Sequence, residues 1–444
     1  MFDLLIVNAR VVNEGAITPL DVGIRDGRIE ALAPQLERNA RETVDARGRH
    51  LLPGMIDDQV HFREPGLTHK ADIASESAAA VAGGITSYME MPNVKPPTLD
   101  SDSLEAKYAL ARGRSHANYA FYHGASNDNL EAIKALDPQT TCGIKIFMGA
   151  STGNMLVDEA DTLDAIFANA AIPVATHCED TPMIQRAEAR ARARYGDDVP
   201  FALHGEIRSR EACYKSSSLA IELARKHHAR LHVLHLTTLE EMALFEPGPI
   251  DGKLITAEAC VHHLWFSDAD YERLGSFIKC NPAIKTAADR DAIRRAVNEG
   301  RIDVIATDHA PHTLEEKQAP YFGAPSGMPL VQHALPSLLT QVNAGHFELT
   351  TIVEKACHNP AKRFELERRG FIREGYAADL VLVDMEKSVE VQRSGLRYKC
   401  GWSPFEGTTL KGAVELTLVN GVRVWDGTQL CAAPAGQRLT YDRR

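Results

Sequence analysis

Both ends of the chain contain short, mostly hydrophobic runs that resemble strands and are bounded by turn residues. The runs near the N-terminus are Leu4–Val12, Leu20–Arg25 and Arg28–Leu32, and those near the C-terminus are Ala378–Asp384, Val414–Val419 and Val422–Trp425. Short runs of this kind, separated by turn signals such as Asp26-Gly27 and Asn420-Gly421, are typical of antiparallel strands. Because the two ends have the same pattern, we expect residues 1–52 and 361–444 to combine into one small β-sandwich domain.

The central part, residues 53–360, alternates apolar strand-like runs with helical patterns. The expected strands are Met55–Phe62, Ile85–Met91, Tyr119–His123, Gly143–Met148, Ile172–His177, Arg230–Leu236, Lys253–Ala259 and Ile302–Thr307. The expected helices include Ala71–Ala82, Leu104–Ala111, Asp161–Ala170, Glu211–His227 and Ala288–Asn298. Strands that each precede a helix predict an α/β fold, a (β/α)8 TIM-like barrel with its chemistry at the C-terminal strand ends. The insertion Asp180–Gly205 is expected to be helix and loop over the barrel mouth.

Composition and charge exclude several functional classes. The chain has 49 basic and 60 acidic residues, and this balance argues against sequence-independent nucleic-acid binding. No apolar run reaches membrane-spanning length, and the N-terminal residues lack the basic head of a signal peptide. The 8 cysteines form no CxxC pair and fit reduced thiols. We therefore expect a cytoplasmic enzyme that binds a small-molecule substrate, without a nucleic-acid or membrane partner.

An unusual number of polar and charged residues lies at the end of the first expected barrel strand. Asp57, Gln59, His61 and Arg63 are each two residues apart, so an extended segment would point all four to the same side. By itself, such a group could be the polar end of a strand at the surface. The other strand ends decide between the two interpretations.

Polar residues recur at the C-terminal ends of later strands. Lys145 lies in an apolar strand, where an ammonium group is costly unless it is paired or chemically modified. His177 ends the fifth strand and Asp308 the eighth. The sixth contains His232 and His235, which are three residues apart, so we expect only one, His235, to face the barrel. Any one of these residues has a structural explanation, but together with the histidine of strand one they suit zinc or a related divalent ion.

Short motifs make the chain similar to the amidohydrolase superfamily and, more narrowly, to the dihydroorotases. They are Pro53-Gly-Met-Ile-Asp57, Arg63-Glu-Pro-Gly66, Met91-Pro-Asn93, His235-Leu-Thr-Thr238, Asn281-Pro282 and Asp308-His-Ala-Pro-His312. The resemblance covers essentially the whole chain, including the β domain formed by the termini. No single motif is specific, but the set is.

The resemblance implies a metal centre with one or two Zn2+ ions per chain, although another divalent metal would also suit it. Lys145, carbamylated by carbon dioxide, would bridge two metals. His177 and His235 would hold the more exposed metal, and His61 and Asp308 the buried one. A carbamylated lysine would also remove the cost of burying an ammonium group, because it becomes a metal-bound carboxylate.

Gln59 departs from the superfamily pattern, which has a histidine at this position. An amide oxygen is a weaker zinc ligand than imidazole. We therefore expect either weak occupancy of the buried metal site or a Gln59 side chain turned away from the metal. A catalytically inactive relative that binds a partner such as aspartate carbamoyltransferase would also lose such a ligand. The remaining ligands argue for an active enzyme.

The resemblance implies reversible hydrolysis of dihydroorotate to N-carbamoyl-aspartate in pyrimidine biosynthesis. A metal would supply a nucleophile near neutral pH and polarise the ring carbonyl. Asp308 would act as general base and then general acid. The planar fork of Arg63 suits the substrate carboxylate. By resemblance, Asn93 and His312 complete the carboxylate pocket, and Asn281 contacts the ring amide.

Several alternatives remain open at this stage. Allantoinases and hydantoinases share the fold and also open cyclic amides, although the motifs at Arg63 and Asn93 favour a dihydroorotase. Arg63 could instead form an ion pair with Glu64 or Asp57. One of the two histidines after strand seven, at positions 262 and 263, could line the site. The family resemblance also suggests a homo-oligomer, either a dimer or a tetramer.

Overall fold

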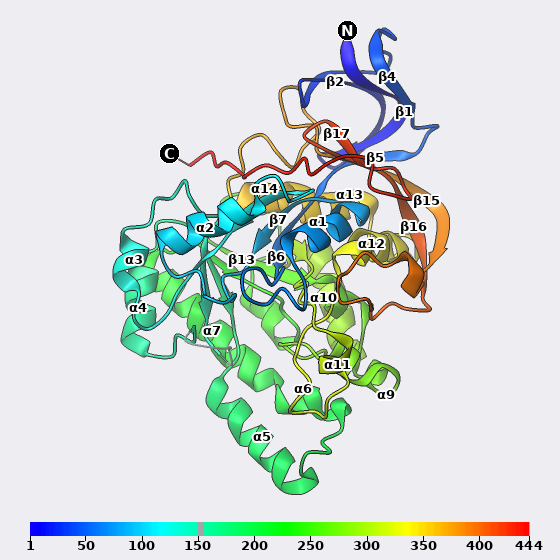
Figure 1. The fold of residues 1–444 in the computed structure, drawn as a ribbon. Helices are drawn as coiled ribbons and strands as arrows, with labels where there is room; N and C mark the ends of the chain where they lie inside the picture. Colours follow the sequence, from blue (N-terminus) through cyan, green and yellow to red (C-terminus); the bar gives the residue numbers. More distant parts are fainter. Residues whose placement is uncertain (150–154, 444) are drawn as a thin grey trace.

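The computed structural model describes residues 1–149 and 155–443 and confirms the predicted (β/α)8 barrel (Figure 1). Its strands are β6 (Met55–Val60), β7 (Ile85–Glu90), β8 (Asn118–Phe121), β9 (His123–Gly124), β10 (Ile144–Phe147), β11 (Val174–His177), β12 (Leu231–Val233), β13 (Ile255–Cys260) and β14 (Val304–Ala306). They pair in parallel in chain order, and the third predicted strand is interrupted at Tyr122. A parallel bridge between Val60 and His309 brings the last strand beside the first and closes the barrel.

The helices follow the predicted spans with small shifts at their ends. They are α1 (Ile73–Ala82), α2 (Ser101–Ala111), α3 (Leu130–Lys134), α4 (Ala160–Asn169), α5 (Thr181–Tyr195), α6 (His204–Ile207), α7 (Arg210–His227), α8 (Val261–Trp265), α9 (Tyr271–Leu274), α10 (Ala287–Glu299), α11 (Leu314–Lys317), α12 (Ala334–Asn343), α13 (Leu349–Val353) and α14 (Asn359–Arg363). Capping explains several starts. Asp72 and Ser75 form a capping box at α1, and Thr286 and Asp289 do so at α10.

A second sheet is assembled from both ends of the chain. It contains β1 (Phe2–Asn13), β2 (Ala16–Arg25), β3 (Arg28–Ala33), β4 (Ala40–Asp45), β5 (His50–Pro53), β15 (Leu380–Glu390), β16 (Thr409–Val419) and β17 (Val422–Trp425). The order is β17-β16-β15-β5-β1-β2-β3, with β4 paired to β1. The central strand β5, which the sequence pattern did not predict, joins the N-terminal strands to the C-terminal ones. Figure 1 shows these blue and red strands together at one side of the barrel.

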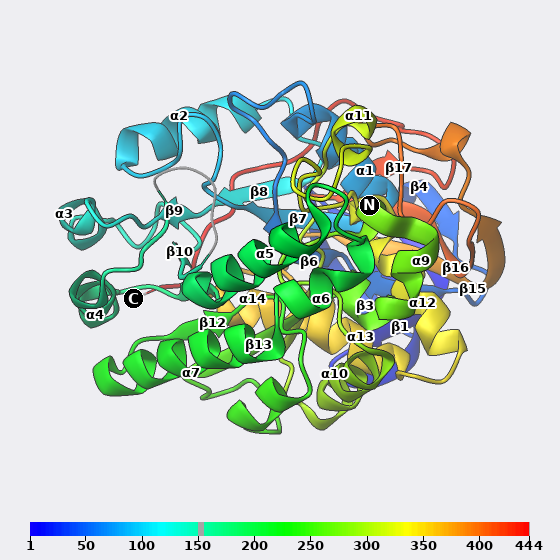
Figure 2. The same ribbon diagram turned by 90° about the horizontal axis from the view of Figure 1, so that it is seen from below.

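The insertion between β11 and α7 folds into an arm beyond the C-terminal strand ends. We use the name "mouth arm" for residues 180–208, which contain α5, a short 3-10 helix (Phe201–Leu203) and α6. In Figure 1 the arm extends from the lower end of the barrel, and the view from below in Figure 2 places α5 and α6 in front of the barrel strands. Ala191, Val199 and Ile207 of the arm pack with Tyr321 in a small apolar cluster of their own.

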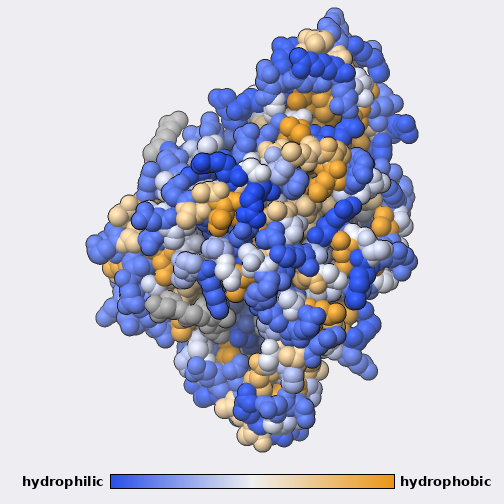
Figure 3. Space-filling model, in the orientation of Figure 1, coloured by the Kyte–Doolittle hydropathy of each residue, from blue (hydrophilic) through white to orange (hydrophobic). Residues whose placement is uncertain are grey.

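The face of the molecule shown in Figure 3 is mostly hydrophilic, and its apolar residues are scattered in small groups. Among residues 1–149 and 155–443, no helix combines the length and the apolar character needed to cross a bilayer. All eight cysteines are free, as their spacing predicts.

Candidate active site

One cavity of about 230 Å³ at the C-terminal strand ends brings together every residue that the sequence predicts for the site. The predicted residues that line it are Gln59, His61, Arg63, Asn93, Lys145, His177, His235, Asn281, Asp308 and His312. Phe147, Ala310 and the segment Pro325–Gly327 complete the wall. These side chains lie together because the C-terminal ends of all the strands are at the same end of a barrel.

Two imidazole nitrogens face each other on one side of this cavity. His177 Nδ1 lies 3.1 Å from His235 Nε2. Two nitrogens bound to one tetrahedral zinc, each at about 2.0–2.1 Å, would lie roughly 3.3 Å apart. Burial lowers the pKa of His235 well below its ordinary value, so its ring is neutral and keeps a lone pair. The donor set and spacing therefore fit a bound divalent metal.

A buried acid holds the first of these histidines in place. His177 Nε2 donates to Glu179 Oε2 over 2.9 Å, which leaves Nδ1 as the acceptor nitrogen. Arg208 donates to the same oxygen over 2.5 Å from the far end of the mouth arm. Burial opposes ionisation of Glu179, but the Arg208 charge and the His177 bond outweigh it and lower its pKa to about 2. Sequence analysis missed this residue, although it shares strand parity with His177.

On the opposite side of the cavity, three side chains meet at one carboxylate oxygen. Asp308 Oδ1 accepts a hydrogen bond from Gln59 Nε2 over 3.2 Å and lies 3.1 Å from His61 Nε2. His61 Nδ1 lies 2.8 Å from Asn93 Oδ1. Asn93 thus lines the predicted cavity, but its oxygen contacts a histidine of strand one.

Lys145 is buried in the cavity wall with 1% of its surface exposed. Its Nζ lies 4.6 Å from the ring centroid of Phe147. Burial lowers the pKa of Lys145 to about 8, against the attraction of Asp308 and Glu258 for the charged form. A substantial fraction of neutral amine is therefore present near neutral pH, and the neutral amine is the form that reacts with carbon dioxide.

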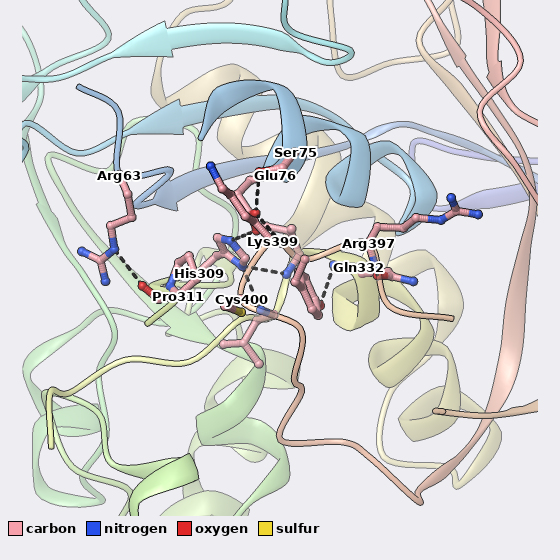
Figure 4. Close-up of polar contacts among 12 residues, drawn as sticks. Arg63, Ser75, Glu76, His309, Pro311, Gln332, Arg397, Lys399 and Cys400 are labelled. Carbon is pink, nitrogen blue, oxygen red and sulfur yellow. Dashed lines mark hydrogen bonds and ion pairs between the residues drawn. The ribbon is translucent and has the colours of Figure 1, made fainter. Parts of the chain in front are cut away.

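The Arg63 guanidinium lines the cavity, and the residues that the structure describes do not use all of its N–H donors. Its Nε donates to the carbonyl of Pro311 over 3.0 Å (Figure 4), and its Nη2 lies 3.0 Å from His312 Nε2. Lys70 Nζ lies 3.0 Å from His312 Nδ1 and can only donate, so Nδ1 is the acceptor. The proton of His312 is then on Nε2, where the carbonyl of Ser326 accepts it over 3.0 Å. Arg63 Nη2 consequently finds no acceptor on this ring.

Neither acid that could have neutralised Arg63 does so. Glu64 pairs with Arg114 over 2.8 Å, and Asp57 accepts from the Thr307 hydroxyl over 2.6 Å. Within the described ranges no carboxylate forms an ion pair with Arg63. Burial lowers its pKa to about 10, so the guanidinium is charged at neutral pH. A buried charge without a counterion indicates a site for an anionic ligand group.

Three residues of the cavity have left-handed backbone conformations. Their φ angles are 69° at Arg63, 39° at His235 and 50° at Asp308. Such conformations cost on the order of 1–3 kcal/mol each in a residue with a side chain, and they concentrate at functional sites. They persist only where surrounding contacts fix the backbone.

His309, the neighbour of Asp308, supplies such contacts (Figure 4). Its Nε2 lies 2.9 Å from Glu76 Oε2 on α1, and its Nδ1 accepts from the Leu330 amide over 2.9 Å. Glu76 also accepts from the Lys399 amide over 3.1 Å. The tip of strand eight is thereby fixed to α1 and to the segment 397–402 that follows β15.

The expectation that only one histidine of strand six faces the barrel was wrong. His232 Nε2 lies 3.0 Å from Asp58 Oδ2 and 3.6 Å from Glu258 Oε2, on the first and seventh strands, so it also points inward. Strand β12 ends at Val233, and the positive φ of His235 breaks the alternation. Both histidines therefore face the interior at different depths.

The structure contains two groups outside the predicted ligand set whose atoms lie within 4.8 Å of one another and could hold a metal. One is Asp58 with His232 and Glu258, and the other is Cys260 with His262 and His263. Neither of the two histidines after strand seven lines the cavity.

Comparison with known proteins agrees with this geometry. The model of the amidohydrolase family matches residues 50–424. A dihydroorotase of Halobacterium salinarum is 35% identical over 430 residues, covering 96% of this chain and 98% of the relative. An allantoinase of Rubrobacter xylanophilus is 33% identical over 452 residues, covering 100% and 98%. The solved L-hydantoinase (dihydropyrimidinase) of Arthrobacter aurescens superposes with a TM-score of 0.94 at 29% identity, covering 99% of this chain and 100% of that one.

The chain therefore belongs to the amidohydrolase family. The relatives confirm the resemblance to dihydroorotases that the motifs predict, and they confirm that the chain is an enzyme, a hydrolase of carbon–nitrogen bonds.

Proposed function

We propose that this amidohydrolase is a dihydroorotase, which opens the cyclic amide of dihydroorotate to N-carbamoyl-aspartate and closes it in reverse. The observation that carries the proposal is the buried Arg63 guanidinium, which forms no ion pair with an acid of residues 1–149 or 155–443, beside the facing pair His177 and His235. Dihydroorotate combines a ring amide with a carboxylate. The rings of hydantoin and allantoin lack that carboxylate, so these substrates would not form an ion pair with Arg63.

The proposed metal is zinc, held by His177, His235 and carbamylated Lys145, with His61 and Asp308 beside it. When bound, zinc supplies a nucleophile near neutral pH and polarises the ring carbonyl. The low pKa of Lys145 favours its modification by carbon dioxide, because the neutral amine is the reactive form.

Asp308 is the proposed general base and acid. Its contacts with Gln59 and His61 both use Oδ1, which leaves Oδ2 to take a proton from the attacking water and deliver it to the ring nitrogen. The left-handed backbone at Asp308 is fixed through His309, so the carboxylate is positioned before substrate arrives. In the ring-closing direction the same carboxylate would accept the proton of the carbamoyl nitrogen.

Substrate orientation is proposed to come from three groups. Arg63 would donate to the carboxylate from its unused nitrogens, with His312 and Asn93 at the same end of the cavity. Asn281 Oδ1 is a buried acceptor without a hydrogen-bond partner among the described residues. It is available for the ring N–H of a cyclic amide, which would give that buried oxygen its partner.

The test is a substrate panel assayed with and without added zinc, using dihydroorotate, allantoin, hydantoin and dihydrouracil. Hydrolysis of dihydroorotate with at least tenfold preference in kcat/KM is expected. A preference for allantoin or hydantoin would replace the proposal with that activity, and inactivity toward all four with zinc present would favour a non-catalytic scaffold. Asp308→Asn is the control, because it should abolish turnover while the zinc content changes little. We also propose that the protein is cytoplasmic and that it forms a homo-oligomer. Light scattering would test the oligomeric state.

A further inference from the structure

We propose that this active site holds a single metal ion, between His177 and His235, and that Gln59 replaces a second ion by donating a hydrogen bond to Asp308. The inference rests on the proposed metal-dependent site and does not depend on which cyclic amide is the substrate. It concerns the side of the cavity where Gln59, His61 and Asp308 meet.

The amide of Gln59 is oriented by its hydrogen bond to Asp308, and the Cys260 thiol, which lies 3.3 Å from Glu258 Oε1, also faces the amide oxygen. Its Nε2 lies 3.2 Å from the carboxylate oxygen Asp308 Oδ1, and its Oε1 lies 3.8 Å from the thiol of Cys260. The reverse orientation would place Oε1 against the carboxylate oxygen, two acceptors without a proton between them. The amide oxygen, the only atom of Gln59 that binds a hard metal ion well, therefore points toward Cys260.

Burial keeps the side chain in this position. Gln59 is 1% exposed and Cys260 is buried beside it, so the amide cannot exchange its partners for water. Swinging Oε1 toward a metal would leave Nε2 without its acceptor and would remove a donor from Asp308. A buried polar group left without a partner destabilises the state that contains it. The cost opposes metal binding on this side of the cavity.

The contacts of the Asp308 carboxylate also oppose the binding of a second metal ion beside it. Its Oδ1 already receives the amide hydrogen of Gln59 and lies against His61, which are the contacts of an oxygen satisfied by the protein itself. A divalent ion on the same oxygen would meet the positive end of the Gln59 amide. On the opposite side, the nitrogens of His177 and His235 face each other without a carboxylate or amide hydrogen between them. That side presents two ligand atoms to one ion without an amide hydrogen from the described part of the chain directed at either of them.

The experiment is zinc titration of the full-length protein, freed of metal and then supplied with bicarbonate. Stoichiometry is measured by elemental analysis after gel filtration, and affinity by competition with a chelating dye. For the wild type we expect one zinc per chain, with any second equivalent bound at least 100-fold more weakly. Gln59→His, which offers a ring nitrogen in place of the amide, should raise the stoichiometry to two. Gln59→Leu, which removes the amide and adds no ligand, should stay at one.

Two tightly bound zinc ions in the wild type would overturn the proposal. A single zinc in all three proteins would overturn the role given to Gln59. Anomalous diffraction from wild-type crystals at the zinc edge is the second measurement, and it does not depend on any variant folding. One peak between His177 and His235 is expected, and an equal peak beside His61 and Asp308 would contradict the inference. Because none of these readouts uses substrate, failure of the proposed dihydroorotase activity would be seen separately.

Discussion

Arg63 is a buried charged residue that forms no ion pair within the part of the chain that the structure describes. Arg63 is 7% exposed, and its neighbour Glu64 is already paired with Arg114. In a protein that had no ligand for it, such a charge would be a cost without compensation. This one side chain therefore indicates that the substrate carries a negatively charged group.

Replacing this arginine should weaken substrate binding far more than folding. Lysine keeps the charge of Arg63 but loses the planar fork, so Arg63→Lys should raise the KM for dihydroorotate by roughly 10- to 100-fold, the equivalent of one or two charge-assisted bonds. Steady-state kinetics measure the effect. Arg114→Lys is the matched control and should leave KM within about twofold. An unchanged KM in Arg63→Lys would place the carboxylate elsewhere.

The modification of Lys145 should depend on pH in metal-free protein. Burial lowers its pKa from the ordinary value of lysine to about 8, so the neutral amine becomes more abundant as pH rises through 8. At fixed dissolved carbon dioxide, the initial rate of carbamylation should rise roughly 20-fold between pH 6.5 and 8.5. NMR with 13C-labelled carbon dioxide, trapped by adding zinc, would follow it. Lys145→Arg should show no such signal, and a rate independent of pH would contradict the prediction.

The sequence predicts which residues share the cavity but does not predict their mutual contacts. Strand parity and strand ends were enough to bring Gln59, Lys145 and Asp308 to the same place. The contact between Glu179 and His177 was not predicted, and neither was the one between Lys70 and His312. Such contacts depend on rotamers and on chain segments distant in sequence, which periodicity does not encode.

At the scale of elements, the mouth arm is attached to the proposed metal site at both of its ends. It starts after His177 and Glu179, and it ends at Arg208, which returns to Glu179. The position of the arm and the orientation of His177 are therefore linked through one buried carboxylate.

Removing that link should reduce metal affinity. Arg208→Gln takes away the charge that keeps Glu179 ionised, so the carboxylate would hold the His177 ring less firmly. Loss of such an outer partner typically costs 10- to 100-fold in metal affinity, and zinc competition with a chelating dye would measure it. Arg192→Gln changes an exposed arginine of the same arm and should have no effect. Equal zinc affinity in wild type and Arg208→Gln would contradict the assignment.

Element types were predictable from periodicity, whereas breaks within elements were not. The barrel strands and the long helices follow the expected spans, because alternation and helical spacing continue over many residues. The third predicted strand, interrupted at Tyr122, is one exception, and β12 is another: it stops at Val233, and the backbone changes direction at His235, which has a positive φ. That change of direction is a property of the backbone, and it left no signal in the pattern of side chains.

At the scale of the whole molecule, the terminal sheet has an apolar cluster of its own and also contributes residues to the core of the barrel. Val12 and Leu52 of the N-terminal strands and Val381 of β15 belong to the same apolar cluster as the barrel residues. We propose the division into residues 1–52 with 361–444 and residues 53–360 as two domains. The boundary at residue 361 falls within α14, which contacts β6 at the base of the barrel.

Among the contacts that hold residues 436–443 against the barrel are those of the buried Arg443 side chain. Arg443 donates to the carbonyls of Pro138, Thr141 and Cys142 and pairs with Glu365, with 4% of its side chain exposed. Arg443→Ala would leave these acceptors unpaired, and it should lower the free energy of unfolding by about 3 kcal/mol or more. Urea unfolding measures this. The exposed Arg393→Ala should change it by less than about 0.5 kcal/mol, and a similar small change at Arg443 would contradict the prediction.

The composite sheet also has a consequence for synthesis on the ribosome. Strand β5 ends at Pro53, and its partner β15 begins at Leu380, so the N-terminal strands wait for more than 300 residues before their sheet can close. At bacterial-to-eukaryotic elongation rates this takes on the order of tens of seconds. During that time the edge of β5 that later pairs with β15 is open to pairing with other nascent chains. Trp402, which follows β15, donates to the carbonyl of His312, so this contact with a residue of the cavity can form only after β15 has been made.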